Sequence, residues 1–249
     1  MSERLLRLGA VLLVLIVVAA ACSVSRPEVL PPPEETGPPP VYVAVGASET
    51  TGVGSDQPLR DAWPRVLHRI ALPAGSVFVN MGIPGATVAQ ALAEEVPDTL
   101  AARPNLVTIW LNVNDMARGV RPAEYERQLE TLVRTMRNNG ATRVLVANTP
   151  PLDNLPAYQA GRLLGALPGP EQVRELVAAY NQAIGRVVER HGALLVDLHA
   201  VGMAARAAGT EAQMVSEDGF HPSTAGHAAV ADAFAEVLRR SGPVTGPSG

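Results

Sequence analysis

Short runs of β-branched and apolar residues alternate with longer helical stretches along most of this sequence. The predicted strands are residues 41–45, 76–79, 106–111, 143–148 and 193–196. Apolar residues also recur every three or four positions at residues 125–136, 173–188 and 230–238, which is the spacing of a buried helix face. Strand–helix alternation leads to a parallel sheet joined by right-handed crossovers. The sequence therefore predicts an α/β fold, a three-layer α/β/α sandwich around a central five-stranded parallel sheet.

The first predicted strand runs directly into a turn that presents a serine. Residues 41–55 read V-Y-V-A-V-G-A-S-E-T-T-G-V-G-S, so Gly46 and Ser48 follow the strand at once. A turn at the carboxyl end of a parallel strand lies where open α/β sheets bind ligands, and glycine lets the backbone approach a substrate closely. By itself a Gly-x-Ser after a strand is more often an ordinary turn with a capping serine.

Three further motifs accompany this serine. They read N-M-G-I-P-G at residues 80–85, N-V-N-D at residues 112–115 and D-G-F-H-P at residues 218–222. The first two follow predicted strands, so they are expected at the same carboxyl edge of the sheet as the serine. The third follows the last strand in a loop closed by Pro222, and Ser223 or Thr224 can cap the next helix.

In this order the four motifs resemble those of the SGNH, or GDSL-type, hydrolases, and the resemblance covers about residues 41–240. It implies a flavodoxin-like fold and a serine hydrolase activity. The implied catalytic residues are the nucleophile Ser48, the base His221 and the acid Asp218. The implied oxyanion-hole groups are Ser48, Gly82 and Asn114.

Two positions depart from the family pattern. Ala47 replaces the aspartate of Gly-Asp-Ser, and Asn112 replaces the glycine of Gly-x-Asn-Asp. Neither change removes a group that does chemistry. Asn112 adds a side chain where the family keeps space, so we expect the departures to affect substrate shape more than activity.

The implied residues meet the chemical needs of ester hydrolysis. A serine hydroxyl is a poor nucleophile at neutral pH, so it requires a base within hydrogen-bond reach and a third group to orient that base. A spacing of three residues lets Asp218 and His221 point from one loop. Each motif taken alone also has a structural explanation. Asp-x-x-His is typical of a capped turn or a surface pair, and Gly82 of an ordinary turn. Asn114 followed by Asp115 is typical of an Asx turn. We expect Asp115 to brace the loop that carries Asn114.

Composition excludes several other classes. The 249 residues are 47% hydrophobic and 18% charged, which suits one globular domain with appendages. The net charge is −4 and the basic residues are scattered arginines, so nucleic acid is not expected as a partner. The single cysteine excludes an intrachain disulfide, and the histidines form no ligand spacing, so neither a metal nor another cofactor is expected.

The N-terminus has the layout of a signal peptide. Residues 1–21 carry two arginines, an apolar run and three alanines before Cys22. That order resembles a bacterial lipobox, which implies lipidation of Cys22 and membrane anchoring at the cell envelope. Because Ala19 stands where a leucine is usual, cleavage at the alanines and secretion is the alternative. We further expect a proline-rich tether at residues 22–40, the hydrolase domain at 41–240 and a flexible tail at 241–249.

Two expectations concern the substrate pocket. The connection at residues 149–170 is long for a compact domain, which is typical of functional loops. We expect its apolar residues to form part of an acyl or alcohol pocket beside the nucleophile. Those residues are Leu152, Leu155, Tyr158, Leu163, Leu164 and Leu167. Glu49, next to the serine, is expected to be solvated. If it faces the cleft instead, it would disfavour anionic substrates near the reacting carbonyl.

The sequence thus predicts an extracytoplasmic serine esterase or lipase that acts on small-molecule or glycan esters by acyl transfer. An α/β-hydrolase also runs serine, aspartate, histidine along the chain, but it requires Gly-x-Ser-x-Gly, and Thr50 occupies the last position here. A polysaccharide O-acetyl esterase would use the same machinery and differ only in substrate. A surface lipoprotein that binds ligand without catalysis is the alternative from another class.

Overall fold

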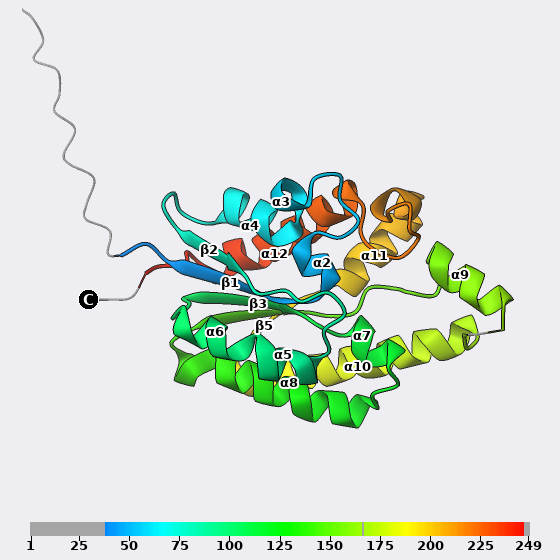
Figure 1. Cartoon of the computed structure of the whole chain (residues 1–249), viewed down its shortest axis with the longest axis horizontal. Coiled ribbons are helices and arrows are strands. Elements are labelled where there is room, and N and C mark those ends of the chain that lie inside the picture. Colours follow the sequence, from blue (N-terminus) through cyan, green and yellow to red (C-terminus); the bar gives the residue numbers. More distant parts are fainter. Residues whose placement is uncertain (1–37, 166, 247–249) are drawn as a thin grey trace, which may run out of the picture. The chain divides into compact units, whose positions relative to one another are not determined.

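A computed structural model describes residues 38–165 and 167–246, and it contains one five-stranded parallel sheet (Figure 1). The strands lie in the order β2-β1-β3-β4-β5. Their bounds are β1 Val41–Gly46, β2 Val77–Asn80, β3 Leu106–Trp110, β4 Arg143–Ala147 and β5 Leu194–Val196. In the central pair Val43 lies opposite Val107 and Gly46 opposite Trp110. The predicted strands therefore all form, and each end lies within one residue of its expected place.

Helices connect and cover the strands. Their bounds are α2 Ser48–Thr51, α3 Pro58–Asp61, α4 Trp63–Ala71, α5 Val88–Glu94, α6 Val96–Ala101, α7 Val113–Ala117, α8 Pro122–Arg137, α9 Pro156–Leu163, α10 Pro170–His191, α11 Leu198–Ala207 and α12 Thr224–Ser241, with the 3-10 helices η1 Asn138–Gly140 and η2 Glu211–Met214. The three stretches with helical periodicity lie in α8, α10 and α12.

The two faces of the sheet form separate hydrophobic cores. On one face Val43, Val107 and Val144 pack with residues of α5, α6, α8 and α10. On the other face Tyr42 and Leu145 pack with residues of α4, α11 and α12. Successive residues of a strand point to opposite faces, so each strand contributes to both cores. The predicted three-layer α/β/α sandwich is confirmed (Figure 1).

The connection at residues 149–170 is not a plain loop, as its length suggested, because it contains α9. Pro156 occupies the first helical position, where a proline's missing N–H is not needed and its fixed φ suits the helix. Tyr158 then packs against Val173 and Val177 of α10. This satellite core holds α9 away from the main sheet, at the right of Figure 1.

Residues 242–246, which belong to the expected tail, contact the domain. Val244 is buried against the core beneath α12, and the Arg143 Nη1 group donates a hydrogen bond to the Gly242 carbonyl. The domain thus extends beyond residue 240, because one apolar side chain of the expected tail reaches the core.

The predicted signal peptide, Cys22 and the tether up to residue 37 lie outside the described residues. Within residues 38–165 and 167–246, no helix combines the length and the apolar character that crossing a membrane requires.

Candidate active site

The predicted nucleophile lies where β1 gives way to α2. β1 ends at Gly46 and Ser48 is the first residue of α2. The turn is tight, because a Cβ added to Gly46 would lie 2.0 Å from the Thr50 hydroxyl. Only glycine fits there. The short helix ends at Gly52, whose φ of 92° is left-handed.

Ser48, His221 and Asp218 form a continuous hydrogen-bonded chain. The His221 Nε2 atom lies 3.0 Å from the Ser48 Oγ atom, and the His221 Nδ1 atom lies 2.6 Å from Asp218 Oδ2. With Nδ1 protonated and donating to the carboxylate, Nε2 is free to accept the serine proton. The structure therefore brings together three residues that the sequence places on two distant loops.

Asp218 is held as a carboxylate. Its Oδ1 atom accepts hydrogen bonds from the Phe220 N–H, the His221 N–H and the Ser216 hydroxyl, at 2.8, 2.9 and 2.8 Å. Burial would raise the pKa of Asp218, but these bonds and the His221 ring outweigh it and hold the pKa well below the usual range. Ser216 was not anticipated; its spacing two residues before an aspartate is the only signal in the sequence.

Two contacts hold the loop that carries His221 in place. Ser223 is the N-cap of α12, and its side chain accepts a hydrogen bond from the Gly226 N–H at 3.1 Å. On the other side a Cβ added to Gly54 would lie 2.4 Å from the Pro222 carbonyl oxygen and 2.9 Å from the His221 Cβ. The loop after α2 thus packs directly on the histidine loop, which fixes the imidazole relative to the serine.

The Gly82 N–H, the expected oxyanion donor, already has a hydrogen-bond acceptor within the protein. Its N–H donates to the Asn80 Oδ1 atom at 3.0 Å, and the Asn80 side chain in turn donates to the Thr50 carbonyl at 2.7 Å. A Cβ on Gly82 would lie 2.9 Å from the Thr50 Cβ. Close packing under the nucleophile turn therefore accounts for this glycine.

The second glycine of the same motif has a freer amide. Among the hydrogen bonds of residues 38–165 and 167–246, none involves the Gly85 N–H. Gly85 has a φ of 80°, and its carbonyl accepts a hydrogen bond from Arg118 at 3.0 Å. The Asn114 Nδ2 atom donates to the neighbouring Ala86 carbonyl at 3.0 Å, which uses one of its two protons. The Asn114 side chain therefore contacts the residue that directly follows Gly85.

Asp115 braces this region, as expected. It is fully buried, and its two carboxylate oxygens lie 3.3 and 3.2 Å from the Val88 N–H at the start of α5. Burial outweighs these bonds and raises the pKa of Asp115 to about 6. The departure residue Asn112 is also buried, and neither polar atom of its side chain has a partner in the described part of the chain. It does not line the cavity described next.

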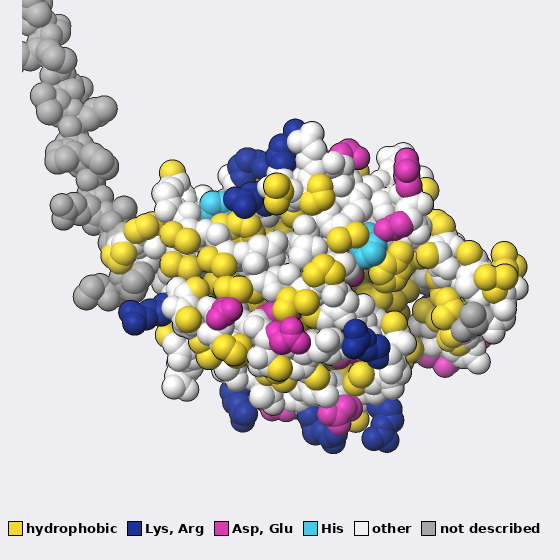
Figure 2. Space-filling view, in the orientation of Figure 1, with side chains coloured by type: hydrophobic (Ala, Val, Ile, Leu, Met, Phe, Trp, Pro, Cys, Tyr) yellow, Lys and Arg dark blue, Asp and Glu magenta, His cyan; other side chains and the backbone are white. Residues whose placement is uncertain are grey.

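An apolar cavity of about 150 Å³ opens beside His221. Its wall includes Trp110, Leu152, Leu155, Met214 and Phe220. Figure 2 shows hydrophobic side chains gathered between the body of the domain and α9.

The expected pocket loop contributes only in part. Leu152 and Leu155 do line the cavity, and Tyr158 packs on α10 instead. The other three leucines of the connection, Leu163, Leu164 and Leu167, are exposed.

Glu49 contradicts the expectation that it is solvated. Its side chain is only 8% exposed, and the residue lines the cavity together with His221. Burial raises the pKa of Glu49, although hydrogen bonds from its own backbone, the charge of His221 and a hydrogen bond with Ser48 act in the opposite direction. The sequence could not reveal this, because loops from residues 150 and 220 close over α2 only in the folded chain.

Three of the other four histidines have side-chain contacts of a structural kind. His68 bonds with Ser76, His191 pairs with Glu130, and the buried His227 lies between the Trp63 N–H and the Val53 carbonyl. Across the described ranges, no group of His, Cys, Asp and Glu side chains could hold a metal ion.

The fold and the site define a class, that of ester hydrolases built on a parallel α/β/α sandwich with a serine at the end of the first strand. Residues 44–229 match the model of the GDSL-like Lipase/Acylhydrolase family, and the chain belongs to that family. It is a carboxylic ester hydrolase.

Relatives support the same conclusion. The chain is 27% identical over 186 residues to Esterase TesA of Pseudomonas aeruginosa, covering 74% of this chain and 80% of that protein. A crystal structure of TesA superposes with a TM-score of 0.62 at 25% identity, covering 80% of this chain and 98% of that one. Axe2, an acetylxylan esterase from Geobacillus stearothermophilus, shares the fold, with a TM-score of 0.61 at 23% identity over 81% of this chain and 94% of that one.

Proposed function

We propose that the protein hydrolyses carboxylic esters through a Ser48-His221-Asp218 triad and an acyl-enzyme intermediate. The observation that carries this proposal is the pair of hydrogen bonds of 3.0 and 2.6 Å that joins the three side chains in the order serine, histidine, aspartate. A ligand-binding protein without catalysis has no need of such an arrangement. The ester hydrolase family to which the chain belongs supports the same reading.

The reaction has two halves. The Ser48 Oγ atom attacks the ester carbonyl carbon while His221 Nε2 takes its proton. The tetrahedral intermediate collapses, the bond to the alcohol oxygen breaks, and His221 returns the proton to the leaving alcohol. A water molecule then attacks the acyl-enzyme with His221 again as base, and the carboxylic acid leaves as Ser48 recovers its proton. Asp218 orients the imidazole and stabilises its cationic form throughout.

For the oxyanion we propose three donors, the Ser48 N–H, the Gly85 N–H and the second amide proton of Asn114. Gly82 is the alternative to Gly85 that the sequence suggested, but Asn80 occupies its N–H at 3.0 Å. The contact between Asn114 and Ala86 supports Gly85, because it brings the amide side chain next to that glycine. Each donor of this kind typically lowers the barrier by about 3 kcal/mol.

The cavity favours substrates with a short group beside the ester. Its volume of about 150 Å³ is well below the roughly 300–1,000 Å³ of pockets for drug-sized ligands. An apolar cavity of roughly 150 Å³ accommodates a molecule the size of benzene. We therefore expect activity to peak at short acyl chains and to fall for palmitoyl esters.

Deacetylation of a polysaccharide is a second candidate. The small cavity suits an acetyl group, and the fold is shared with an acetylxylan esterase. Acetylated xylan as substrate separates the two candidates. Release of acetate from it with a kcat/KM above that for short p-nitrophenyl esters would favour the second.

We also propose that the protein is exported and anchored through lipidated Cys22. The support is the signal-peptide layout of residues 1–21 and the small residues that precede the cysteine. Intact-mass measurement of the protein from the membrane fraction tests this, with Cys22→Ser as control. An unmodified wild type in the soluble fraction would refute the anchor.

The activity test is hydrolysis of p-nitrophenyl esters from acetyl to palmitoyl by the domain from Ser23 onward. Ser48→Ala and His221→Ala should each lower kcat by roughly 10⁴-fold or more. Ser55→Ala and His199→Ala are controls with the same residue types, because neither residue has a hydrogen bond with the triad in the described part of the chain, and both variants should retain activity. Hydrolysis that persists in Ser48→Ala would refute the mechanism.

A further inference from the structure

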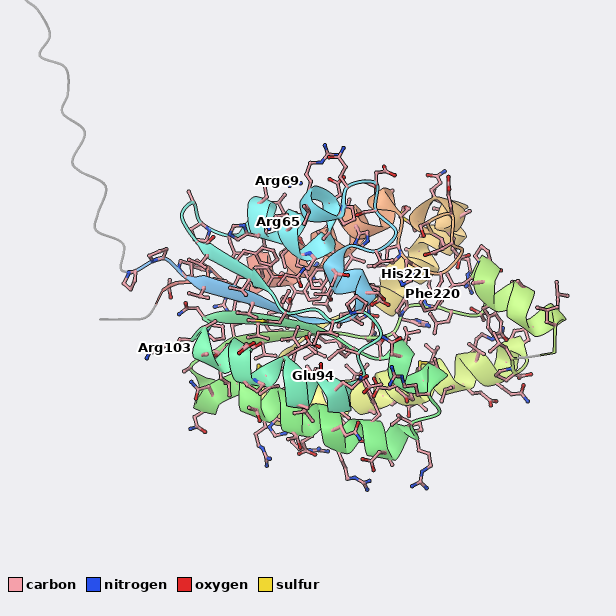
Figure 3. All side chains as sticks on the ribbon, in the orientation of Figure 1. Arg65, Arg69, Glu94, Arg103, Phe220 and His221 are labelled. Atoms are coloured by element: carbon pink, nitrogen blue, oxygen red, sulfur yellow. The ribbon has the colours of Figure 1, made fainter. Side chains whose placement is uncertain are left out.

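Glu49 is a carboxyl group that the hydrolytic mechanism does not use. It follows the nucleophile directly, is 8% exposed and lines the cavity beside His221 and Phe220. The rings of His221 and Phe220 lie edge to face at 4.9 Å, and Figure 3 shows both at the same end of the sheet. Polar groups are rarely buried in apolar surroundings without a full set of partners, and the hydrogen bonds with its own backbone and Ser48 leave accepting capacity of this carboxyl toward the cavity.

The protein itself supplies no countercharge for Glu49. Among the ion pairs of residues 38–165 and 167–246, none includes Glu49. Of the described residues that line the cavity, one other carries a carboxyl group, Glu211, and it has partners in Arg206 at 2.7 Å and Asn154 at 2.7 Å. His221, which lines the same cavity, is already hydrogen-bonded to Asp218 through its Nδ1 atom.

A hydroxyl group on the substrate would be a suitable hydrogen-bond partner for the Glu49 carboxyl. Burial raises the pKa of Glu49, and a carboxyl group accepts hydrogen bonds in either protonation state and also donates one when protonated. A hydroxyl group matches both functions without bringing a charge into the cavity. A purely aliphatic group would cover the carboxyl and leave its remaining hydrogen-bonding capacity unused, and a site of this kind disfavours the analogue that lacks the hydroxyl.

We propose that Glu49 is a specificity-determining residue that binds a hydroxyl group of the substrate, so that the preferred esters carry a hydroxyl within a few bonds of the scissile ester. Consecutive Cα atoms are about 3.8 Å apart, which keeps the Glu49 side chain close to the reacting carbonyl at Ser48. The inference rests on the proposed function, because it assumes that the ester reacts at Ser48.

The experiment compares matched ester pairs in the wild type, Glu49→Gln and Glu49→Leu. One pair places the hydroxyls on the alcohol, glyceryl monobutyrate against propyl butyrate. The other places one on the acyl group, ethyl 3-hydroxybutyrate against ethyl butyrate. In at least one pair the wild type should favour the hydroxylated ester by roughly tenfold or more in kcat/KM. Glu49→Gln should keep most of this preference, since an amide also donates and accepts, and Glu49→Leu should abolish it.

A preference that is equal in all three proteins, or absent from both pairs in the wild type, would overturn the proposal. A stronger preference for butyrylcholine than for either hydroxylated ester would overturn it as well, since it would make Glu49 a cation site. Binding of the same pairs to Ser48→Ala, measured by calorimetry, does not depend on turnover. Equal affinities there would reject the role of Glu49 even if the proposed hydrolysis failed, and hydrolysis of p-nitrophenyl butyrate tests that function separately.

Discussion

Replacing Glu95 with glutamine should remove a pH-dependent loss of stability from the base of the nucleophile turn. Glu95 is 1% exposed, its Oε2 atom accepts a hydrogen bond from the Gly46 N–H at 2.8 Å, and its Oε1 atom has no partner among the described residues. Burial raises the pKa of Glu95 from 4.5 to about 8, with the Gly46 bond acting against this and the charge of Glu94 adding to it.

The raised pKa sets the direction and size of the effect. The folded state binds the Glu95 proton more tightly than the unfolded chain, so the free energy of unfolding falls as the pH rises from about 4.5 to about 8 and is flat beyond. The two pKa values differ by 3.5, and at about 1.36 kcal/mol per pH unit the full loss is about 5 kcal/mol. Between pH 5 and pH 8 the loss should grow by about 3 to 4 kcal/mol.

Urea unfolding of the wild type and Glu95→Gln at pH 5, 6.5 and 8 measures this. The free energy of unfolding of the variant, relative to that of the wild type, should increase by about 3 to 4 kcal/mol between pH 5 and pH 8. Any effect of the amide itself on stability should be the same at each pH. Glu94→Gln is the matched control, because Glu94 is the exposed neighbour on α5 and carries the same charge change (Figure 3). A stability difference that is independent of pH, or equal for both variants, would refute the assignment of a neutral buried carboxyl at Glu95.

Three further outcomes follow from the site. Asp218→Asn should lower kcat by about 10⁴-fold with the fold retained, because the imidazole loses its orienting carboxylate; steady-state kinetics with circular dichroism checks this, and near-normal turnover would contradict the triad. Asn114→Ala should lower kcat by roughly 10²- to 10³-fold with little change in KM, and a change confined to KM would exclude it as an oxyanion donor. Ser223→Ala should cost about 1 kcal/mol in thermal unfolding as α12 loses its N-cap, whereas an unchanged midpoint would show that the cap contributes nothing.

Much of the fold was predictable because parallel strands buried on both faces read as continuous apolar runs. The β1 and β3 runs are buried along almost their full length, and the sequence located both within one residue. The helix at Pro156–Leu163 was missed because its stability comes from packing Tyr158 on α10, which local periodicity does not encode.

Some residues of the candidate site could likewise be predicted from the sequence and others could not. Ser48 and His221 are 173 residues apart, yet both could be named because each lies in a short motif whose chemistry is local. The sequence pointed to Gly82 as an oxyanion donor, and it could not show that the Asn80 side chain accepts a hydrogen bond from the Gly82 N–H.

The sequence by itself determined the order of strands and helices, the ester hydrolase motifs and the pairing of Asp218 with His221 across a single loop. These follow from patterns and spacings that act over a few residues. Only the tertiary structure decided that Glu49 is buried beside an apolar cavity and that the Glu95 carboxylate accepts a hydrogen bond from the Gly46 N–H of the nucleophile turn. Burial of a carboxyl is set by segments that are distant in the chain and meet only after folding, so no local pattern announces it.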